Sequence, residues 1–237
     1  MNSKFTKTNL FSCPIYKSRI DPDSYDKEKI LNDIEYNKSL KNKRNDAHQA
    51  IGHHSNIHHS YNDFNNEDFR IINYEKLIAT NLKTFNEFFN NELFTTREFG
   101  FTFNIVNYSA ITEGQYLPAH NHVPTADFAC IHYLNYKDDH SPTCFRSPVS
   151  WAQYMHFILK EFRDTLDILH PDNSLFLTNF LFPVQEDDII IFPAMLDHQV
   201  MEQGTTDETR VTISTNIKIT TSVPEWWRTT NEQNEHT

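Results

Sequence analysis

Four segments with strand-like patterns constrain the fold of this chain more than any other feature. Residues 99–108 alternate apolar and polar side chains almost without a break, and residues 126–136 and 188–192 are apolar runs. Residues 210–220 alternate most cleanly, with one face made of Val211, Ile213, Thr215, Ile217 and Ile219. Successive side chains of a strand point to opposite faces, so this alternation predicts half-buried strands. Several strands separated by loops predict a sandwich or barrel of antiparallel strands.

Three segments have helical periodicity instead. Residues 73–93 form the clearest helix, with an expected apolar face of Leu77, Ile78, Leu82, Phe85, Phe88 and Phe89. Residues 25–40 fit a second helix. Residues 151–169 are amphipathic and are followed by Pro171, as is typical of a helix end. We expect this third helix to be an insertion, spanning residues 147–175, within a β-rich domain.

The domain boundaries follow from these elements. Residues 1–98 are expected to form a helical and irregular N-terminal region packed on the core, residues 99–222 the core itself, and residues 223–237 a polar tail. Within the first region, residues 10–16 are apolar but contain a proline, which is tolerated in an edge strand. The histidine-rich segment 52–60 is expected to be a loop, and its four histidines are expected to lie at the rim of a site. They are His53, His54, His58 and His59.

Composition limits the classes of protein that fit the sequence. The chain has 32 acidic and 21 basic residues among 237, and its formal charge of −11 disfavours binding to nucleic acid. The three cysteines have no metal-site spacing and cannot form a closed set of disulfides, which favours a reducing compartment. No signal peptide and no apolar run of roughly 20 residues is present, so we expect a cytoplasmic protein without a membrane span.

Three histidines could meet one metal ion. His120 and His122 are two residues apart, so on a strand their imidazoles project from the same face. His198 follows the apolar run 188–192 by a few residues and would bring a third imidazole from a second strand. Each histidine alone is more often structural than a ligand. Their order along the chain, followed by an arginine at the next strand, favours a common site.

That arginine suggests a site for an anion. Arg210 begins the last alternating segment, and the inner face of that strand would continue with Thr212 and Ser214. A guanidinium group with neighbouring hydroxyls suits a buried carboxylate, which it can hold with two hydrogen bonds.

Taken together, these motifs resemble the 2-oxoglutarate/iron(II) oxygenase superfamily, whose fold is a double-stranded β-helix, the jelly roll shared with cupins. The sequence is most similar to a bacterial and phage family of oxygenases with a His-x-His motif. The matching parts are His120-Asn121-His122, Asp187–Pro193, His198 and Arg210–Asn216. The resemblance covers residues 100–220 apart from the insertion. It implies a mostly β fold with flanking helices, Fe(II) as the metal and 2-oxoglutarate as co-substrate.

The resemblance also implies roles for single residues. His120, His122 and His198 would hold Fe(II), and Arg210 would bind the distal carboxylate of 2-oxoglutarate. Around that carboxylate the resemblance places Thr212, Ser214 and Tyr133, the last because its strand is similar to a strand of prolyl hydroxylases in which a tyrosine contacts 2-oxoglutarate. Asn104 or Asn107, on the preceding strand, would line the co-substrate pocket.

The sequence departs from the superfamily at the third ligand. The usual motif is His-x-Asp, and His122 stands where that Asp would fall. Either His122 completes a three-histidine site, or Asp127 supplies a carboxylate. Asp127 lies five residues after His122, so strict alternation places it on the other face and favours His122. Thr212 replaces the usual Ser, and Glu186 the usual Gly of the turn before residues 188–192.

The predicted function is therefore an Fe(II)- and 2-oxoglutarate-dependent dioxygenase, a hydroxylase that acts on a small molecule or a protein side chain. One alternative is a cupin-like three-histidine metalloenzyme that does not use 2-oxoglutarate and gives Arg210 no role. Another is a non-catalytic β-rich binding module with incidental histidines. A homodimer is expected from the prevalence of such assemblies, and the Asn-rich, Gly-poor composition suggests a virus-encoded protein.

Overall fold

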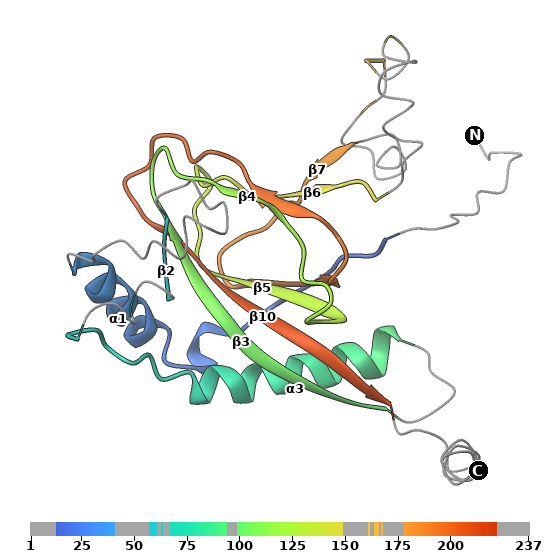
Figure 1. The fold of residues 1–237 in the computed structure, drawn as a ribbon, viewed down its shortest axis with the longest axis horizontal. Coiled ribbons are helices and arrows are strands. Elements are labelled where there is room, and N and C mark those ends of the chain that lie inside the picture. The colour runs from blue at the N-terminus through green and yellow to red at the C-terminus, as the bar shows by residue number, and fades with distance from the viewer. Residues whose placement is uncertain are drawn as a thin grey trace, which may run out of the picture.

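Two antiparallel sheets form the centre of the computed structural model (Figure 1), which describes residues 13–40, 57–60, 63, 67–93, 99–148, 161, 164–165, 167 and 178–221. The helical elements are a short 3-10 helix (Pro22–Ser24), α1 (Lys27–Ser39) and α3 (Glu75–Glu92). The strands are β1 (Tyr16–Arg19), β2 (His58–His59), β3 (Phe99–Ile111), β4 (Leu117–His120), β5 (Phe128–Asn135), β6 (Thr143–Arg146), β7 (Asn179–Leu181), β8 (Asp188–Pro193), β9 (His198–Val200) and β10 (Arg210–Thr221).

The strand order is that of a jelly roll. The larger sheet has the order β1-β8-β5-β10-β3-β2 and the smaller has β4-β9-β6-β7. From β3 to β10 the chain passes back and forth between the two sheets, except at the β6–β7 hairpin. This alternation is the double-stranded β-helix arrangement, in which two four-stranded layers enclose a common interior. It confirms the fold class predicted from the sequence.

Helix α3 lies along β3 and β10 on the outer face of the larger sheet (Figure 1) and buries a cluster of aromatic rings. Phe85, which has no exposed surface, packs edge-on against Phe103 at 5.1 Å and Phe101 at 6.4 Å between ring centroids. Phe88 and Phe89 both contact the ring of Phe128 on β5. These contacts hold the N-terminal helices and the sheet in one core. In the part of the chain that the structure describes, no helix is both long and apolar enough to span a membrane.

A β-bulge in β3 decides which side chains face the interior. Ser214 of β10 pairs with Asn107, but the next residue, Thr215, pairs with Ile105, so Val106 is an extra residue. Before the bulge, Phe101, Phe103 and Ile105 face the α3 side; after it, Tyr108 and Ala110 do. Asn107 and Ser109 are thereby turned to the inside, as bulges beside functional sites commonly do.

The acidic turn before β8 is fastened to α1. Lys27 Nζ contacts Glu186 Oε1 at 2.7 Å and Asp187 Oδ1 at 2.6 Å, and its side chain is nearly buried. Asp187 has a φ of 66°, a left-handed conformation that Asp adopts more readily than most residues. Glu186, the residue before this position, stands where the resemblance expects Gly, and its carboxylate is one of the two that pair with Lys27.

The two predicted N-terminal helices are confirmed as α1 and α3, but part of the predicted apolar face of α3 is wrong. Ile78 and Leu82 are 43% and 44% exposed, while Asn81 is buried. The buried face follows Leu77, Asn81, Phe85, Phe88 and Phe89. Ile78 and Leu82 are each rotated by about 100° from Leu77 and Asn81 and therefore lie outside it.

Two predictions for the N-terminal region also need correction. Of the predicted loop 52–60, His58 and His59 form β2, which pairs with Ala110 and Ser109 of β3. The predicted edge strand at 10–16 begins only at Tyr16 and lies beside β8. Both strands depend on a partner far away in sequence.

The predicted insertion helix and the C-terminal tail lie almost entirely outside the described residues, and the domain boundaries stay a prediction.

Replacing Phe85 by Ala should destabilise the fold strongly. The change removes a fully buried ring and leaves a cavity between α3 and β3, which costs about 3–5 kcal/mol in comparable cores. Chemical denaturation followed by circular dichroism measures the loss. Ile78→Ala is the matched control on the exposed face of the same helix and should change stability by less than about 0.5 kcal/mol. Equal effects of the two variants would contradict the packing described here.

His132 should make the protein sensitive to acid. It is 1% exposed on β5, and burial together with the charge of Lys27 lowers the pKa of its imidazole to about 3. The unfolded chain binds a proton near pH 6.5 and the folded chain does not. Stability due to this group is therefore complete above pH 6.5 and falls by up to about 1.4 kcal/mol per pH unit below it. Urea denaturation between pH 7 and 5 should give a shallower pH dependence for His132→Leu. An unchanged dependence would contradict this assignment.

Candidate metal centre

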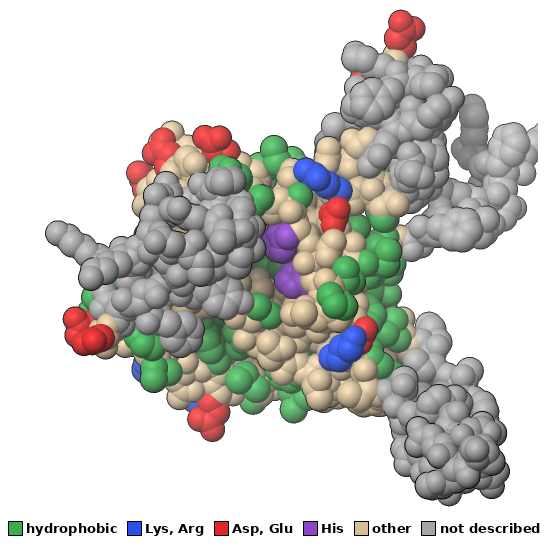
Figure 2. Space-filling view, viewed as in Figure 1, with side chains coloured by type: hydrophobic (Ala, Val, Ile, Leu, Met, Phe, Trp, Pro, Cys, Tyr) green, Lys and Arg blue, Asp and Glu red, His purple; other side chains and the backbone are tan. Residues whose placement is uncertain are grey.

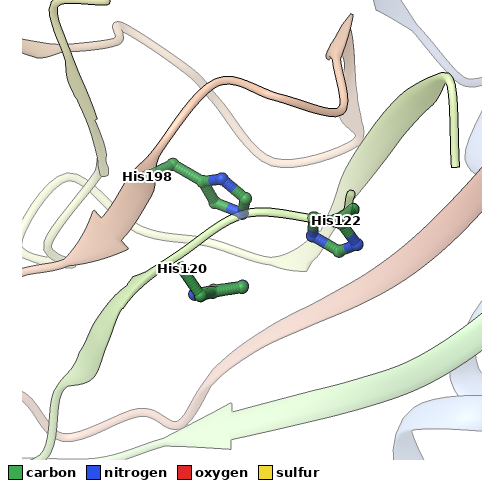
Figure 3. Close-up of side chains that lie close together, drawn as sticks. All are labelled: His120, His122 and His198. Atoms are coloured by element: carbon green, nitrogen blue, oxygen red, sulfur yellow. The ribbon is translucent and has the colours of Figure 1, made fainter. Parts of the chain in front are cut away.

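Three imidazoles meet at one edge of the smaller sheet. His120 ends β4 and pairs with His198, which begins β9, and His122 follows β4 by two residues. The ring centroids of His120 and His198 are 4.3 Å apart, and that of His122 lies 5.4 and 5.3 Å from the other two. One ligand nitrogen from each lies within 4.8 Å of the others. Figure 3 shows the three side chains grouped around a common space.

Each imidazole is held by a hydrogen bond on the same ring nitrogen. His120 Nδ1 contacts the carbonyl oxygen of Pro118 at 2.9 Å, and His198 Nδ1 that of Leu196 at 3.0 Å. His122 Nδ1 contacts Asn216 Oδ1 at 2.7 Å. These oxygens only accept hydrogen bonds, so Nδ1 carries the proton in all three rings and the lone pair of Nε2 is free to bind a metal.

The three rings are neutral at pH 7. Burial lowers the pKa of His198 to about 3, with further lowering by His120 and His122. Burial also lowers the pKa of His120, which its hydrogen bond to Pro118 partly offsets. For His122, burial and then the neighbouring His120 lower the pKa. A neutral imidazole is the form that ligates metals, so no proton has to be displaced from these ligands.

Asp127, the alternative carboxylate ligand, is occupied elsewhere. Its Oδ2 accepts a hydrogen bond from the backbone N–H of Ile219 at 2.8 Å, and its Oδ1 contacts Lys218 Nζ at 3.0 Å. These two interactions, the backbone bond first, lower the pKa of this largely exposed carboxyl group. Among the described residues, the cluster that could hold a metal contains histidines alone.

Arg210 is buried and has no carboxylate partner among the residues that the structure describes. Its side chain is 1% exposed and donates from Nη2 to Thr143 Oγ1 at 3.5 Å, while Nε has no hydrogen-bond partner among the described residues. Its guanidinium carbon lies 5.4 Å from the ring centre of Tyr133 and 5.9 Å from that of Tyr136. Burial lowers the pKa of Arg210. A buried cation of this kind requires an anion, because burying an unpaired charge is costly.

Hydroxyl groups surround that guanidinium. Tyr133 Oη lies 2.6 Å from Thr143 Oγ1, and Thr212, which pairs with Tyr133 across β5 and β10, is also buried. Burial raises the pKa of Tyr133 to about 12, although Arg210 acts to lower it. The Tyr133 hydroxyl is therefore protonated and can donate to an anion at pH 7.

The Arg210 group and the three histidines face the same interior. Thr143, which Arg210 contacts, and Phe145, which pairs with His198, are two residues apart on β6. They share one face of the strand and are separated by roughly 7 Å. The group around Arg210 and the group around His198 are therefore neighbours along β6.

A cavity of about 700 Å³ opens beside the histidines. Figure 2 shows histidine side chains at the bottom of a hollow on this face. Its lining residues are His59, Asn104, Val106, Asn107, Ser109, Leu117, His120, Asn121, His122, Val123, Thr125, Ser214 and Asn216.

The predicted site residues divide between this cavity and the protein interior. Asn104, Asn107 and Ser214 line the cavity together with His120 and His122. The predicted residues Arg210, Thr212 and Tyr133 do not line it and lie buried.

Some residues of the cavity were not expected from the sequence. Asn216 is the last residue of the matching segment Arg210–Asn216, and this position was the one sequence signal for its contact with His122. Ser109 carries no such signal, because the bulge that turns it inward cannot be read from the residue pattern. Of the predicted histidine rim, His59 lines the cavity, His58 does not, and His53 and His54 lie outside the described residues.

The sequence match fits this geometry. Residues 107–216 match the model of a protein family described as "Putative 2OG-Fe(II) oxygenase". The matched range contains the three histidines and Arg210. Over this range, which is just under half of the chain, the sequence is similar to the 2OG-Fe(II) oxygenase family. No curated protein sequence matches the chain.

Solved structures of two prolyl hydroxylases and of one oxidoreductase of the 2OG-Fe(II) oxygenase family are similar to this one at low sequence identity. A prolyl-4-hydroxylase from Pseudomonas putida is 9% identical, with a TM-score of 0.48 over 87% of this chain and 94% of that one. A prolyl hydroxylase from Trichoplax adhaerens, in complex with a peptide fragment of the hypoxia inducible factor oxygen degradation domain, is 10% identical, with a TM-score of 0.48 over 86% and 83%. A 2OG-Fe(II) oxygenase family oxidoreductase from Burkholderia pseudomallei is 8% identical, with a TM-score of 0.37 over 57% of each chain. The similarity to the 2OG-Fe(II) oxygenase family therefore rests on the sequence match and not on these structures.

Replacing Asn216 by Ala should weaken metal binding by about 10–100-fold, the usual effect of losing a partner that orients a ligating histidine. The variant removes the acceptor of the His122 Nδ1 proton and leaves the ring itself in place. Competition with a chelator under anaerobic conditions measures the Fe(II) affinity. Lys218→Ala, an exposed position two residues along the same strand, is the control. Unchanged affinity in Asn216→Ala would show that His122 does not need this bond.

Proposed function

We propose that this chain is an Fe(II)- and 2-oxoglutarate-dependent dioxygenase that hydroxylates its substrate. The main support for the proposal is that the three histidines and Arg210 face the same space between the two sheets. Three neutral imidazoles with free Nε2 atoms converge at one position. Arg210, buried without a carboxylate partner among the described residues, contacts Thr143, which is two residues along β6 from the Phe145 that pairs with His198.

His120, His122 and His198 would hold the metal. Imidazole nitrogen is a suitable ligand for Fe(II), and the Nδ1 hydrogen bonds fix the ring orientations before the ion arrives. The familiar oxygenase site has two histidines and one carboxylate. With His122 in place of the carboxylate, the protein contributes no negative charge to the centre. A dianionic co-substrate would then supply the charge compensation itself.

Arg210 would bind the distal carboxylate of 2-oxoglutarate. Its Nε and Nη2 can form two parallel hydrogen bonds to a carboxylate, which neutralise the buried guanidinium. The hydroxyls of Thr143 and Tyr133 lie beside it and can donate to the same group. Thr212 and Ser214 follow on the same face of β10, between Arg210 and the cavity.

When bound, Fe(II) and 2-oxoglutarate supply the oxidation: dioxygen is consumed, 2-oxoglutarate is converted to succinate and carbon dioxide, and one oxygen atom enters a C–H bond of the substrate. The chain itself orients the reactants and excludes water. Phe145 and Phe192 pack against the His198 ring at 5.9 and 4.9 Å between centroids and keep that side of the centre dry. The open cavity leaves the opposite side for a substrate.

The alternatives account for less of the structure. A cupin-like metalloenzyme without 2-oxoglutarate would leave the buried Arg210 with no anionic partner among the described residues. A binding module would not require the same Nδ1 bond on all three histidines. The expected homodimer, the cytoplasmic location and the virus-encoded origin stay predictions.

Anaerobic titration of the purified chain with Fe(II) and then 2-oxoglutarate tests the proposal. A visible metal-to-ligand charge-transfer band should saturate at one iron per chain and be absent in His198→Ala. Arg210→Gln should keep the Fe(II) affinity but weaken 2-oxoglutarate binding at least 10-fold, since a buried charge-assisted pair is lost.

Asp127→Asn is the matched control for the ligand set and should leave the band unchanged, because its carboxylate contacts Lys218 and Ile219 instead. Loss of the band in Asp127→Asn would contradict the three-histidine site. Stoichiometric Fe(II) binding without any band would favour the cupin-like enzyme, and absence of Fe(II) binding would favour the binding module.

A further inference from the structure

We propose that the cavity beside the histidines binds an uncharged amide group of the substrate, and that Asn107 is the residue that recognises it. The inference rests on the proposed function for the reaction, but it concerns the substrate. Its evidence comes from the charge of the cavity, the unused hydrogen-bonding groups in its wall and the position of the β3 bulge.

The described wall of the cavity contains no acidic or basic side chain other than histidine. None of the described residues that line it is Asp, Glu, Lys or Arg, whereas four are Asn. Val106, Leu117 and Val123 add apolar surface. A cationic substrate group entering this half-enclosed site would lose hydration without gaining a counter-charge, and as long as no metal ion is bound the same holds for an anionic group. The buried cation of the interior, Arg210, does not line this space. The cavity therefore favours a neutral polar group with apolar neighbours.

Two of the four amides already have partners within the protein. Asn121 Nδ2 donates to Asp197 Oδ1 at 2.8 Å. Asn216 Oδ1 accepts from His122, and its Nδ2 contacts Thr125 Oγ1 at 3.3 Å. These side chains shape the wall and hold the metal centre. They leave Asn104 and Asn107 as the amides of β3 that face the cavity.

The Asn107 side chain has an unused acceptor. Its Oδ1 is buried and has no hydrogen-bond partner among the residues that the structure describes. A buried carbonyl oxygen without a donor is unfavourable, so a ligand that offers an N–H group would be favoured at this position. The same side chain carries an N–H₂ donor, so it can pair with both the N–H and the C=O of another amide.

The bulge at Val106 makes Asn107 available. Without the extra residue, Asn107 would face α3 and Tyr108 would face the cavity. Asn107 instead pairs in register with Ser214, and Asn104 with Asn216, which touches His122. These four polar residues form one floor that leads to the metal centre. An amide bound on it would place neighbouring C–H groups of the substrate on the same side as the histidines.

A nucleobase could also pair with an Asn amide, as adenine does in DNA recognition. The charge of −11 opposes the approach of a phosphate backbone, so an amide-bearing molecule such as a peptide is favoured. The experiment below distinguishes the two ligands by comparing adenosine with an amide probe.

Three small probes that differ mainly in charge test this inference. They are neutral N-acetylglycinamide, anionic N-acetylglycine and cationic glycinamide, titrated at pH 7 into the full-length ¹⁵N-labelled protein without a metal ion, because a bound metal would itself attract the anionic probe. Chemical shifts of residues around the cavity give the dissociation constants without any turnover. N-acetylglycinamide should bind at least 10-fold more tightly than either charged probe. Asn107→Leu, of similar volume, should weaken it at least 10-fold, and Asn107→Asp should invert the order in favour of glycinamide.

Asn179→Leu, an exposed position on β7, is the control and should leave all three affinities unchanged. The proposal is overturned if N-acetylglycinamide gives no saturable shifts at the cavity, if a charged probe binds the unmodified protein as well, or if adenosine binds more tightly. If N-acetylglycinamide binds but the Fe(II) and 2-oxoglutarate titration gives no charge-transfer band, the proposed oxygenase reaction is wrong and the amide site stands. If the band forms but N-acetylglycinamide does not bind, the proposed reaction stands and the amide substrate class is wrong.

Discussion

The hydrogen bonds on Nδ1 of the three histidines are the interactions on which the site depends. Two of them come from backbone carbonyls only two residues before the histidine, so local chain conformation fixes the rings of His120 and His198. The third comes from Asn216 on β10, and it connects the ligand that departs from the superfamily pattern to the larger sheet. The metal centre therefore requires both layers of the jelly roll to be in place.

The same fold separates two kinds of chemistry. Between the sheets, Arg210 lies among Tyr133, Thr143 and Thr212, in a closed space suited to an anion. Toward the open side, the β3 bulge presents uncharged amides and hydroxyls. A charged co-substrate and a neutral substrate could therefore approach the same three imidazoles from different directions without competing for one set of contacts.

The sequence predicted the features that follow from periodicity and from the order of motifs, namely the long strands and the fold class. Alternation in residues 99–108 and 210–220 identified the two longest strands, and the jelly-roll class followed from the resemblance. Features set by distant partners were missed: β2 exists because β3 supplies its hydrogen bonds, and the inward turn of Ser109 requires a bulge that no residue type marks. The parity argument against Asp127 agrees with its contacts to Lys218 and Ile219, which lie 91 and 92 residues away.

The most direct test of the three-histidine centre is anomalous X-ray diffraction from crystals loaded with Fe(II) without oxygen. The account predicts a single strong iron peak at about 2 Å from Nε2 of His120, His122 and His198, within the normal range for metal–imidazole bonds. An iron peak coordinated by a carboxylate in place of His122, or a peak at another position in the chain, would contradict it.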